Sequence, residues 1–321
     1  GEHMNAASVQ GCLAALVEVI GRVVYGAEAH VRLAFVAWLV RGHILLEGAP
    51  GTGKTLFARC FVRCLGLSMR RLQCTPDLMP GDVLGANVFD FGSQSFALTK
   101  GPVFTELLLA DEVNRTPPKA QSALLEAMQE RSVTIDGVTH ALPSRFMVVA
   151  TQNPIEHEGT YPLPEAQLDR FLFKLDVGYP EEHEELAAVI AHGVTSTSPD
   201  LDGLSLGPLF AGELVDGLCQ VPASIRLEED VARYAVALAR ATRDHHSLSV
   251  GLSPRAATML VAAARASAAC DGRDFTVPDD VKALFLPAAR HRVVLTPAAE
   301  MEDLTADLVL GEVLDQVPAP R

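Results

Sequence analysis

Basic side chains are scarce in this sequence. Its 321 residues include 26 Lys and Arg against 40 Asp and Glu, which gives a formal net charge of −14. Proteins that bind nucleic acids need a basic surface that can neutralise phosphates. The charge balance therefore argues against nucleic acid as a partner, although a local basic loop could lie within an acidic total.

The sequence also lacks paired cysteines and long apolar runs. Its six cysteines show no spacing typical of disulfide scaffolds or zinc ribbons. Cys60 and Cys64 lie four residues apart on an expected helix and could share a ligand, but we favour two small buried apolar groups. No stretch approaches the roughly 20 apolar residues that span a bilayer, and no secretory signal is visible. We therefore expect a soluble, cytoplasmic protein.

Strand and helix patterns alternate in the first half of the sequence. The expected strands are continuously apolar, which is typical of a parallel sheet covered on both faces. Residues 81–101 and 132–139 instead indicate two β-hairpins, the second with Asp136-Gly137 as its turn. The expected strands of the sheet are 43–47, 69–74, 104–112, 145–153 and 170–177, and the expected helices are 31–40, 54–65 and 117–130.

The second half of the sequence is helical. Strand signals disappear after Pro180, and Ala-rich helices follow a segment that is rich in Ser, Thr, Pro, Asp and Gly. The predicted fold class is therefore α/β, with a core of residues 5–193, a linker of 194–211 and an all-α domain of 212–321. Residues 1–4, GEHM, are interpreted as a cloning remnant.

A phosphate-binding loop is the clearest motif. Residues 48–55, GAPGTGKT, match G-x-x-x-x-G-K-[ST] between an expected strand and an expected helix. The glycines let backbone N–H groups turn towards phosphates, and the helix N-terminus adds partial positive charge. Lys54 is predicted to reach the β and γ phosphates, and the Thr55 hydroxyl to bind Mg²⁺. The alternative is a strand-to-helix turn without a ligand. The predicted nucleotide contacts here are Gly48, Ala49, Pro50, Gly51, Thr52, Gly53, Lys54, Thr55 and Leu56.

Two acidic residues follow the apolar strand LLLA. This strand is expected to deliver Asp111 to the carboxyl edge of the sheet, where it would bind Mg²⁺. Glu112 is placed to polarise the attacking water. A solvated surface carboxylate is the alternative for Glu112. A GTPase would normally carry N-K-x-D, which is absent, and a small-molecule kinase would not need Glu112, so hydrolysis of ATP is favoured.

Four segments together resemble the MoxR family of AAA+ ATPases. They are residues 23–55, 107–137, 150–173 and 251–257, in this order, and the resemblance covers essentially the whole chain after residue 4. The resemblance implies an AAA+ αβα parallel-sheet core followed by a small all-α helical lid domain. It also implies a homo-oligomer, typically a hexameric ring with ATP and Mg²⁺ at the subunit interfaces.

The resemblance assigns roles to three further residues. Asn153 resembles sensor 1, which holds the attacking water or the γ-phosphate, although it could be an Asn-Pro turn residue. Arg170 resembles the arginine finger that reaches the neighbouring subunit's ATP, and the alternative is an ion pair with Asp169 or Glu165. Arg255 resembles sensor 2, and the alternative is an exposed helix arginine.

The resemblance also suggests where the base and a partner would bind. Val23, Val24 and Tyr25 match the segment that usually contacts adenine, but apolar residues there are also ordinary core. The two hairpins match insertions that face the pore or the partner in related branches. The aromatic residues of the first hairpin could grip a substrate or could pack beneath their own hairpin. They are Phe89, Phe91 and Phe96.

The family's known companions are von Willebrand factor A domain proteins, and its implied work is chaperone-like remodelling or maturation of a protein. A ring-forming ATPase acting on a protein substrate is therefore the leading hypothesis. A nucleotide-gated scaffold with slow turnover is the second. A DNA-remodelling helicase is weaker, because its pore loops would need to be basic and these hairpins are not. His245 and His246 could suggest metal handling, but a polar loop is the preferred account.

Overall fold

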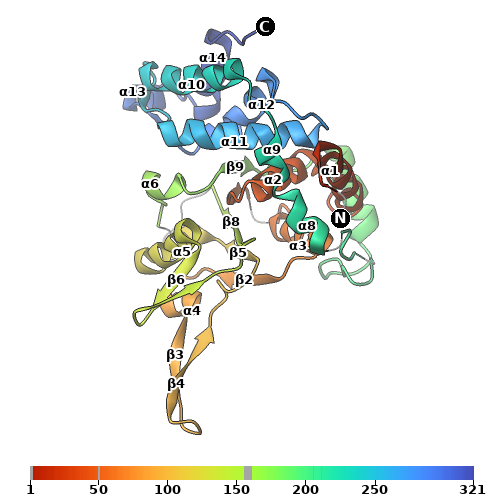
Figure 1. Ribbon diagram of the computed structural model, residues 1–321, viewed down its shortest axis with the longest axis vertical. Coiled ribbons are helices and arrows are strands. Elements are labelled where there is room, and N and C mark those ends of the chain that lie inside the picture. The colour runs from red at the N-terminus through yellow and green to blue at the C-terminus, as the bar shows by residue number, and fades with distance from the viewer. Residues whose placement is uncertain (1–2, 50, 155–160, 205, 211) are drawn as a thin grey trace.

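A five-stranded parallel sheet forms the centre of the protein. The computed structural model describes residues 3–49, 51–154, 161–204, 206–210 and 212–321. The strand order is β2-β5-β8-β1-β9 (Figure 1), so the strand that precedes the phosphate-binding loop is flanked on both sides. All five predicted strands are confirmed. They are β1 (Ile44–Glu47), β2 (Met69–Gln73), β5 (Leu107–Asp111), β8 (Met147–Gln152) and β9 (Phe173–Asp176).

The continuous apolar runs have a simple structural cause. Successive strand residues point to opposite faces of a sheet, and helices cover both faces here. In β5, Leu107 and Leu109 join one buried cluster, whereas Leu108 and Ala110 join another. Both faces must therefore be apolar, which removes the alternation of a half-exposed strand. The covering helices include α2 (Glu28–Leu39), α3 (Lys54–Leu65) and α5 (Pro118–Glu130), and α1 (Ala6–Gly21) packs against α2 and α3.

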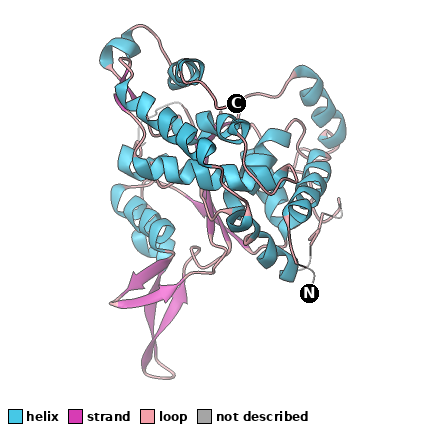
Figure 2. Ribbon diagram, turned by 45° about the horizontal axis from the view of Figure 1, so that its top comes forward, coloured by secondary structure: helices cyan, strands magenta, loops and turns pink. Residues whose placement is uncertain are grey.

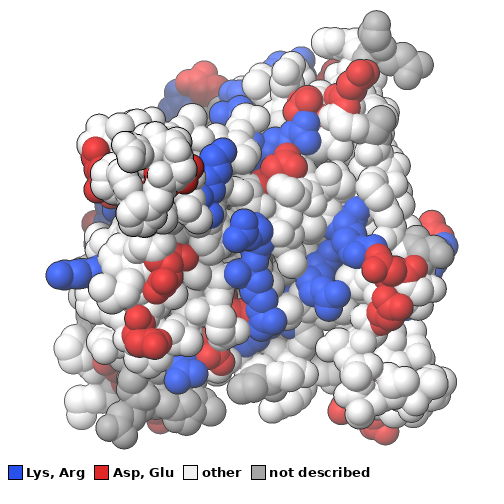
Figure 3. Space-filling view, turned by 90° about the horizontal axis from the view of Figure 1, so that it is seen from below, with Lys and Arg blue, Asp and Glu red and all other residues white. Residues whose placement is uncertain are grey.

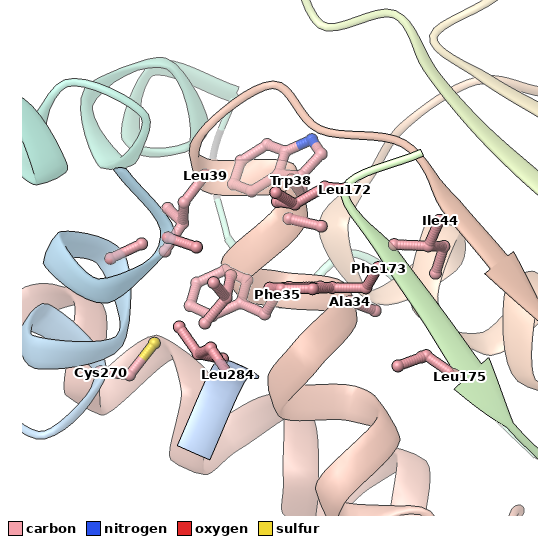
Figure 4. Close-up of a cluster of buried hydrophobic side chains, with 14 of the residues drawn as sticks. Ala34, Phe35, Trp38, Leu39, Ile44, Leu172, Phe173, Leu175, Cys270 and Leu284 are labelled. Carbon is pink, nitrogen blue, oxygen red and sulfur yellow. The ribbon is translucent and has the colours of Figure 1, made fainter. Parts of the chain in front are cut away.

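The C-terminal helices share a hydrophobic core with one face of the sheet. Figure 4 shows Phe35 and Trp38 of α2 packed near Phe173 of β9, with Cys270 and Leu284 reaching the same cluster from the C-terminal domain. The helices of this region are α8 (Gly212–Leu218), α9 (Val221–Ser224), α10 (Glu229–Asp244), α11 (Pro254–Cys270), α12 (Pro278–Ala289), α13 (Pro297–Met301) and α14 (Ala306–Gln316).

The all-α prediction for the C-terminal domain was incomplete. Strands β10 (Leu248–Val250) and β11 (Val294–Leu295) form a small antiparallel pair between its helices. They have three and two residues, too short for a periodic pattern to show in the sequence. Helix α1 was also not predicted, although Asn5 caps it by accepting a hydrogen bond from the Ser8 N–H at 3.1 Å, and its apolar residues follow a helical spacing.

Both predicted hairpins are present and project from the helical body (Figure 2). The first consists of β3 (Gly85–Asp90) and β4 (Ser95–Lys100), and the short helix α4 (Pro80–Leu84) precedes it. The second consists of β6 (Ser132–Ile135) and β7 (Val138–Ala141). Its turn residues Asp136 and Gly137 have φ values of 49° and 79°, as a two-residue turn of this type requires.

Cys60 and Cys64 are ordinary buried side chains of the core. Cys60 and Cys64 are fully buried in α3, and burial raises the pKa of their thiols to about 12 and about 11. They are therefore neutral near pH 7, as the buried interpretation predicts.

Across the part of the chain that the structure describes, no helix combines the length and the apolar character needed to cross a membrane.

His43 makes the stability of the core depend on pH. Its Nδ1 accepts a hydrogen bond from the Val148 N–H at 2.9 Å and its Nε2 donates to the Met128 carbonyl at 3.0 Å, so the ring is neutral. Burial, with a smaller contribution from Arg131, lowers the pKa of His43 to about 3 from 6.5. Because the pKa of His43 is lower in the folded than in the unfolded protein, protonation of this side chain favours unfolding. The folded state is therefore most stable above pH 6.5, and it loses stability as the pH falls below that value.

We expect His43 to lower the free energy of unfolding by about 1.4 kcal/mol for each pH unit between 6.5 and about 3. Urea denaturation at pH 7.5, 6.0 and 5.0 measures this slope. His291 adds to it, because burial also lowers the pKa of that side chain. The variant His43→Gln, which cannot gain a proton, should show a shallower slope than the wild type. Equal slopes in both proteins would contradict the assignment.

Candidate nucleotide-binding site

The loop between β1 and α3 has the conformation that its glycines allow. Gly51 and Gly53 have φ values of 80° and 85°, in the left-handed region that L-residues rarely adopt. A Cβ atom at either position would meet no atom within 4 Å, so both glycines border open space. Gly48 differs, because a Cβ there would collide with the Val177 carbonyl. Thr52 Oγ1 closes the loop by donating to the Ala49 carbonyl at 2.8 Å, and Pro50 lies outside the described residues.

Lys54 begins α3 and connects this loop to β8. Its Nζ donates hydrogen bonds to the Gly48 carbonyl at 2.6 Å and to Asn153 Oδ1 at 3.1 Å. Burial lowers the pKa of Lys54, whereas the nearby carboxylates of Asp111 and Glu112 oppose that shift. The predicted phosphate-binding lysine and the predicted sensor residue are therefore in direct contact, and Thr55 follows Lys54 in the first turn of α3.

Asp111 ends β5 as a buried carboxylate with two donors. Its side chain is 7 % exposed. Oδ1 accepts a hydrogen bond from Thr151 Oγ1 at 3.2 Å, and Oδ2 accepts one from Arg71 Nε at 2.5 Å. The strand delivers this carboxylate to the carboxyl edge of the sheet, as the sequence predicts. Asp111 lies close enough to Lys54 for its negative charge to raise the pKa of the lysine, against the larger effect of burial.

Glu112 is held by partners and is not a freely solvated side chain. Its backbone is left-handed, with φ 56° and ψ 52°, a costly conformation for a non-glycine residue that is often found at functional sites. Its Oε1 accepts from Asn153 Nδ2 at 3.4 Å, and its Oε2 pairs with Arg115 at 3.1 Å. Asn153 thus joins the predicted general base to Lys54, which a simple Asn-Pro turn residue would not do.

Asp169, which directly precedes Arg170, pairs with two arginines of the C-terminal domain. In the described residues, Asp169 pairs with Arg292 at 2.8 Å and with Arg255 at 3.7 Å, rather than with Arg170. Among the ion pairs of the described residues, Arg170 pairs with neither Asp169 nor Glu165, so the ion-pair alternative for Arg170 is wrong. Arg255 lies in the first turn of α11, whose cap is Ser253, and its side chain is 56 % exposed.

A cavity of about 630 Å³ lies beside the phosphate-binding loop, within the size range of small-molecule sites. Its walls include Val24 and Tyr25, the predicted adenine contacts, and residues of helix α7 (Glu182–His192), which packs against the same segment. Among the described residues, the six predicted catalytic and metal-binding residues do not line this cavity: Thr55, Asp111, Glu112, Asn153, Arg170 and Arg255. The remaining wall residues include Val23, Gly51, Thr52, Gly53, Lys54, Leu56, Val177, Tyr179 and Pro180.

Helix α7 is a part of the site that sequence reasoning missed. His192 Nε2 donates to the Val23 carbonyl at 2.8 Å, and its ring lies 6.0 Å from that of Tyr25. The carboxylate of Glu184 packs against Gly26, where a Cβ would collide with it. Because these contacts join residues about 160 positions apart, no local motif in the sequence could reveal them.

The aromatic residues of the first hairpin form a cluster near its end. Phe89 makes edge-to-face contacts with Phe91 and Phe96, at centroid distances of 5.0 and 5.2 Å. Phe91 and Phe96 are nevertheless 85 % and 71 % exposed. Phe89 is therefore partly covered by the other two rings, whereas Phe91 and Phe96 are exposed and can contact another molecule.

The histidine pair belongs to the packing of the C-terminal domain. His245 is buried, stacks on His246 at a centroid distance of 4.6 Å and bonds to Glu312 of α14 at 3.1 Å. Within the described ranges, no group of three or more His, Cys, Asp and Glu residues is arranged to hold a metal ion. Both histidines lie in the segment between α10 and β10, as the polar-loop interpretation expects, but the side chain of His245 is buried.

Comparison with known proteins matches both parts of the chain. Residues 43–173 match the family model for the ATPase family associated with various cellular activities (AAA), and residues 240–313 match the AAA lid domain. The chain is 42% identical to the uncharacterized protein YeaC of Bacillus subtilis, over 95% of this chain and 93% of that protein. It is also 42% identical to chaperone MoxR1 of Mycobacterium tuberculosis, over 100% of this chain and 85% of that protein.

A more distant relative and a solved structure support the same relationship. The protein MoxR of Methylorubrum extorquens is 31% identical, over 94% of this chain and 93% of its own length. The crystal structure of a candidate ATPase from Cytophaga hutchinsonii superimposes with a TM-score of 0.89 at 34% identity, over 98% of this chain and 97% of that one. The similarity therefore extends over both the sheet-containing core and the helical domain.

Proposed function

Because the chain belongs to the MoxR family of AAA+ ATPases, we propose that it forms a ring and couples hydrolysis of Mg²⁺-bound ATP to the remodelling or maturation of a protein partner. The observation that carries this proposal is the chain of contacts from Lys54 through Asn153 to Glu112. It supports the proposal because the Lys54 ammonium and the Glu112 carboxylate, the cation and the base that the proposed reaction needs, contact the two ends of one amide.

The residues present fit Mg²⁺-ATP. The open side of Gly51 and Gly53 faces the space that phosphates need, and the N-terminus of α3 favours negative charge there. Thr55 and Asp111 supply the hydroxyl and carboxylate oxygens that Mg²⁺ prefers. The bound metal would neutralise charge on the phosphoryl oxygens. The base would lie in the cavity that Val24, Tyr25 and α7 line.

The protein's own residues supply the rest of the reaction. Lys54 places positive charge next to the transferring phosphoryl group, where charge stabilisation lowers the barrier. Glu112 accepts a proton from the attacking water. Asn153 fixes the Glu112 carboxylate by its hydrogen bond, so that the base is oriented before the water is activated.

Arg170 and Arg255 are the basis for proposing a ring. Arg255 pairs with Asp169, and Arg170 directly follows Asp169 in the chain. Figure 1 shows α6 (Glu165–Leu168), which ends just before Asp169, on the opposite side of the sheet from α3. A head-to-tail assembly would bring the arginine side of one subunit to the nucleotide side of the next, and a closed set of such contacts is a ring.

The proposed partner is a protein. The relative named chaperone MoxR1 supports a chaperone-like role, and a von Willebrand factor A domain protein is the companion that we propose. The exposed rings of Phe91 and Phe96 on the projecting hairpin are suited to contact a protein surface. Figure 3 shows acidic and basic side chains mixed on one face, with short basic tracts near its centre, so binding of nucleic acid is included in the test below.

Capture from a cell extract tests this partner. The Glu112→Gln variant should retain a specific protein in ATP but not in ADP. The variant that also carries Phe91→Ala and Phe96→Ala should retain much less of it. Equal recovery in both nucleotides would contradict a nucleotide-driven partner cycle, and recovery that nuclease treatment removes would favour a nucleic-acid function.

A further inference from the structure

Arg71 reaches from the edge of the sheet to the predicted metal-binding carboxylate. Strand β2 is an edge strand that pairs with β5, and Gln73 is the residue opposite Asp111. Arg71 lies two positions earlier, yet its Nε donates to Asp111 Oδ2 at 2.5 Å. Its terminal nitrogen also donates to Gln73 Oε1 at 3.2 Å, which holds the guanidinium in this orientation. The contacts with Asp111 and Gln73 together hold the Arg71 guanidinium beside the Asp111 carboxylate.

The two partners differ strongly in burial. The Asp111 side chain is 7 % exposed, whereas that of Arg71 is 52 % exposed. A buried carboxylate needs a compensating charge, because a buried unpaired charge is costly. A half-exposed guanidinium can move into water at little cost. Such a pair is suited to exchange its cation while the carboxylate stays in place.

Other cations near Asp111 are engaged elsewhere. Lys54 bonds to Gly48 and Asn153, and Arg115 pairs with Glu112. Among the ion pairs of the described residues, the one that Asp111 makes is with Arg71. The second oxygen of Asp111 accepts from the neutral Thr151 hydroxyl. Arg71 is thus the charge that a divalent cation would meet at this carboxylate.

We propose that Arg71 is a positioning residue that competes with the divalent metal for Asp111 and so sets the metal concentration at which nucleotide is held tightly. Two cations a few ångströms apart repel each other, and each lowers the affinity of the site for the other. This inference rests on the proposed function, because it takes Asp111 as part of a Mg²⁺-ATP site. It concerns metal dependence and not the chemical step.

Titration of Mg²⁺ against a fluorescent ADP at fixed concentration tests the competition. In Arg71→Ala, the Mg²⁺ concentration that gives half-maximal tightening should fall by about fivefold or more, the lower end of typical coupling between two sites. Arg70→Ala is the matched control, because Arg70 is the preceding, exposed residue of β2 and its loss changes the net charge equally. Arg70→Ala should leave the midpoint unchanged. Direct binding of Mn²⁺, measured by electron paramagnetic resonance, should likewise be tighter in Arg71→Ala than in Arg70→Ala and the wild type.

Three results would overturn the inference. An unchanged Mg²⁺ midpoint in Arg71→Ala with a lower melting temperature would make the pair merely structural. An equal loss of ADP affinity with Mg²⁺ and with EDTA would make Arg71 a phosphate contact. If Arg71→Ala does not fold, Arg71→Gln removes the same charge, and an unchanged midpoint there would also overturn it. A wild-type protein that binds no ADP at any Mg²⁺ concentration would instead refute the proposed function itself.

Discussion

Replacement of Glu112 by Gln is expected to lower the rate of ATP hydrolysis by about 10²–10⁴-fold while ATP binding persists. Gln has the same shape and keeps an oxygen that can accept from Asn153, but it cannot take a proton from water. The contacts of Lys54 with Gly48 and Asn153 do not involve Glu112, so the phosphate-binding loop should be unaffected.

Phosphate release and equilibrium binding of ATP measure the two halves of this prediction separately. Glu126→Gln is a suitable control, because Glu126 is an exposed carboxylate on α5 and its substitution changes the charge in the same way. Turnover in that control should match the wild type. Unchanged turnover in Glu112→Gln would show that another group activates the water. A parallel loss of ATP binding would show that Glu112 supports the loop and not the reaction.

The parts of the site that sequence could predict are those that depend on local constraints. Lys54 begins α3 as expected, because the glycine pattern fixes both the loop and the start of the helix. Asp111 is the last residue of β5, as the apolar run before it predicts. The Asp136-Gly137 turn follows from positive φ values that few residue types tolerate. In each case the physical cause lies within a few residues.

The parts that sequence could not predict depend on contacts between distant segments. His192 meets Val23 only because α7 folds back across the cavity. Asp169 takes Arg255 and Arg292 as partners from another region of the chain, whereas proximity in sequence had suggested Arg170. Arg71 donates to Asp111 from a neighbouring strand, 40 positions away in the chain. Such pairings follow from how helices and strands are packed together, which residue spacing does not encode.

Replacement of Arg170 by Ala is expected to lower the rate of ATP hydrolysis by about 10³–10⁵-fold, the range found when an arginine finger is removed. Asp169 is already engaged by Arg292 and Arg255, so this loss should not release a buried carboxylate. The thermal stability of Arg170→Ala should therefore stay close to that of the wild type. Arg240→Ala, which removes an exposed arginine of α10, should leave the rate of hydrolysis unchanged.

Mixing two inactive variants distinguishes action on the neighbouring subunit from action within one subunit. A subunit with Lys54→Ala still offers Arg170, and a subunit with Arg170→Ala still offers Lys54. In a ring assembled at random from equal amounts of both, about a quarter of the interfaces combine the two intact halves, because contacts are head-to-tail. Turnover should therefore reappear on mixing. Co-purification through a tag on one variant must first show that mixed rings form. If mixed rings form and stay inactive at every ratio, Arg170 does not act across the interface.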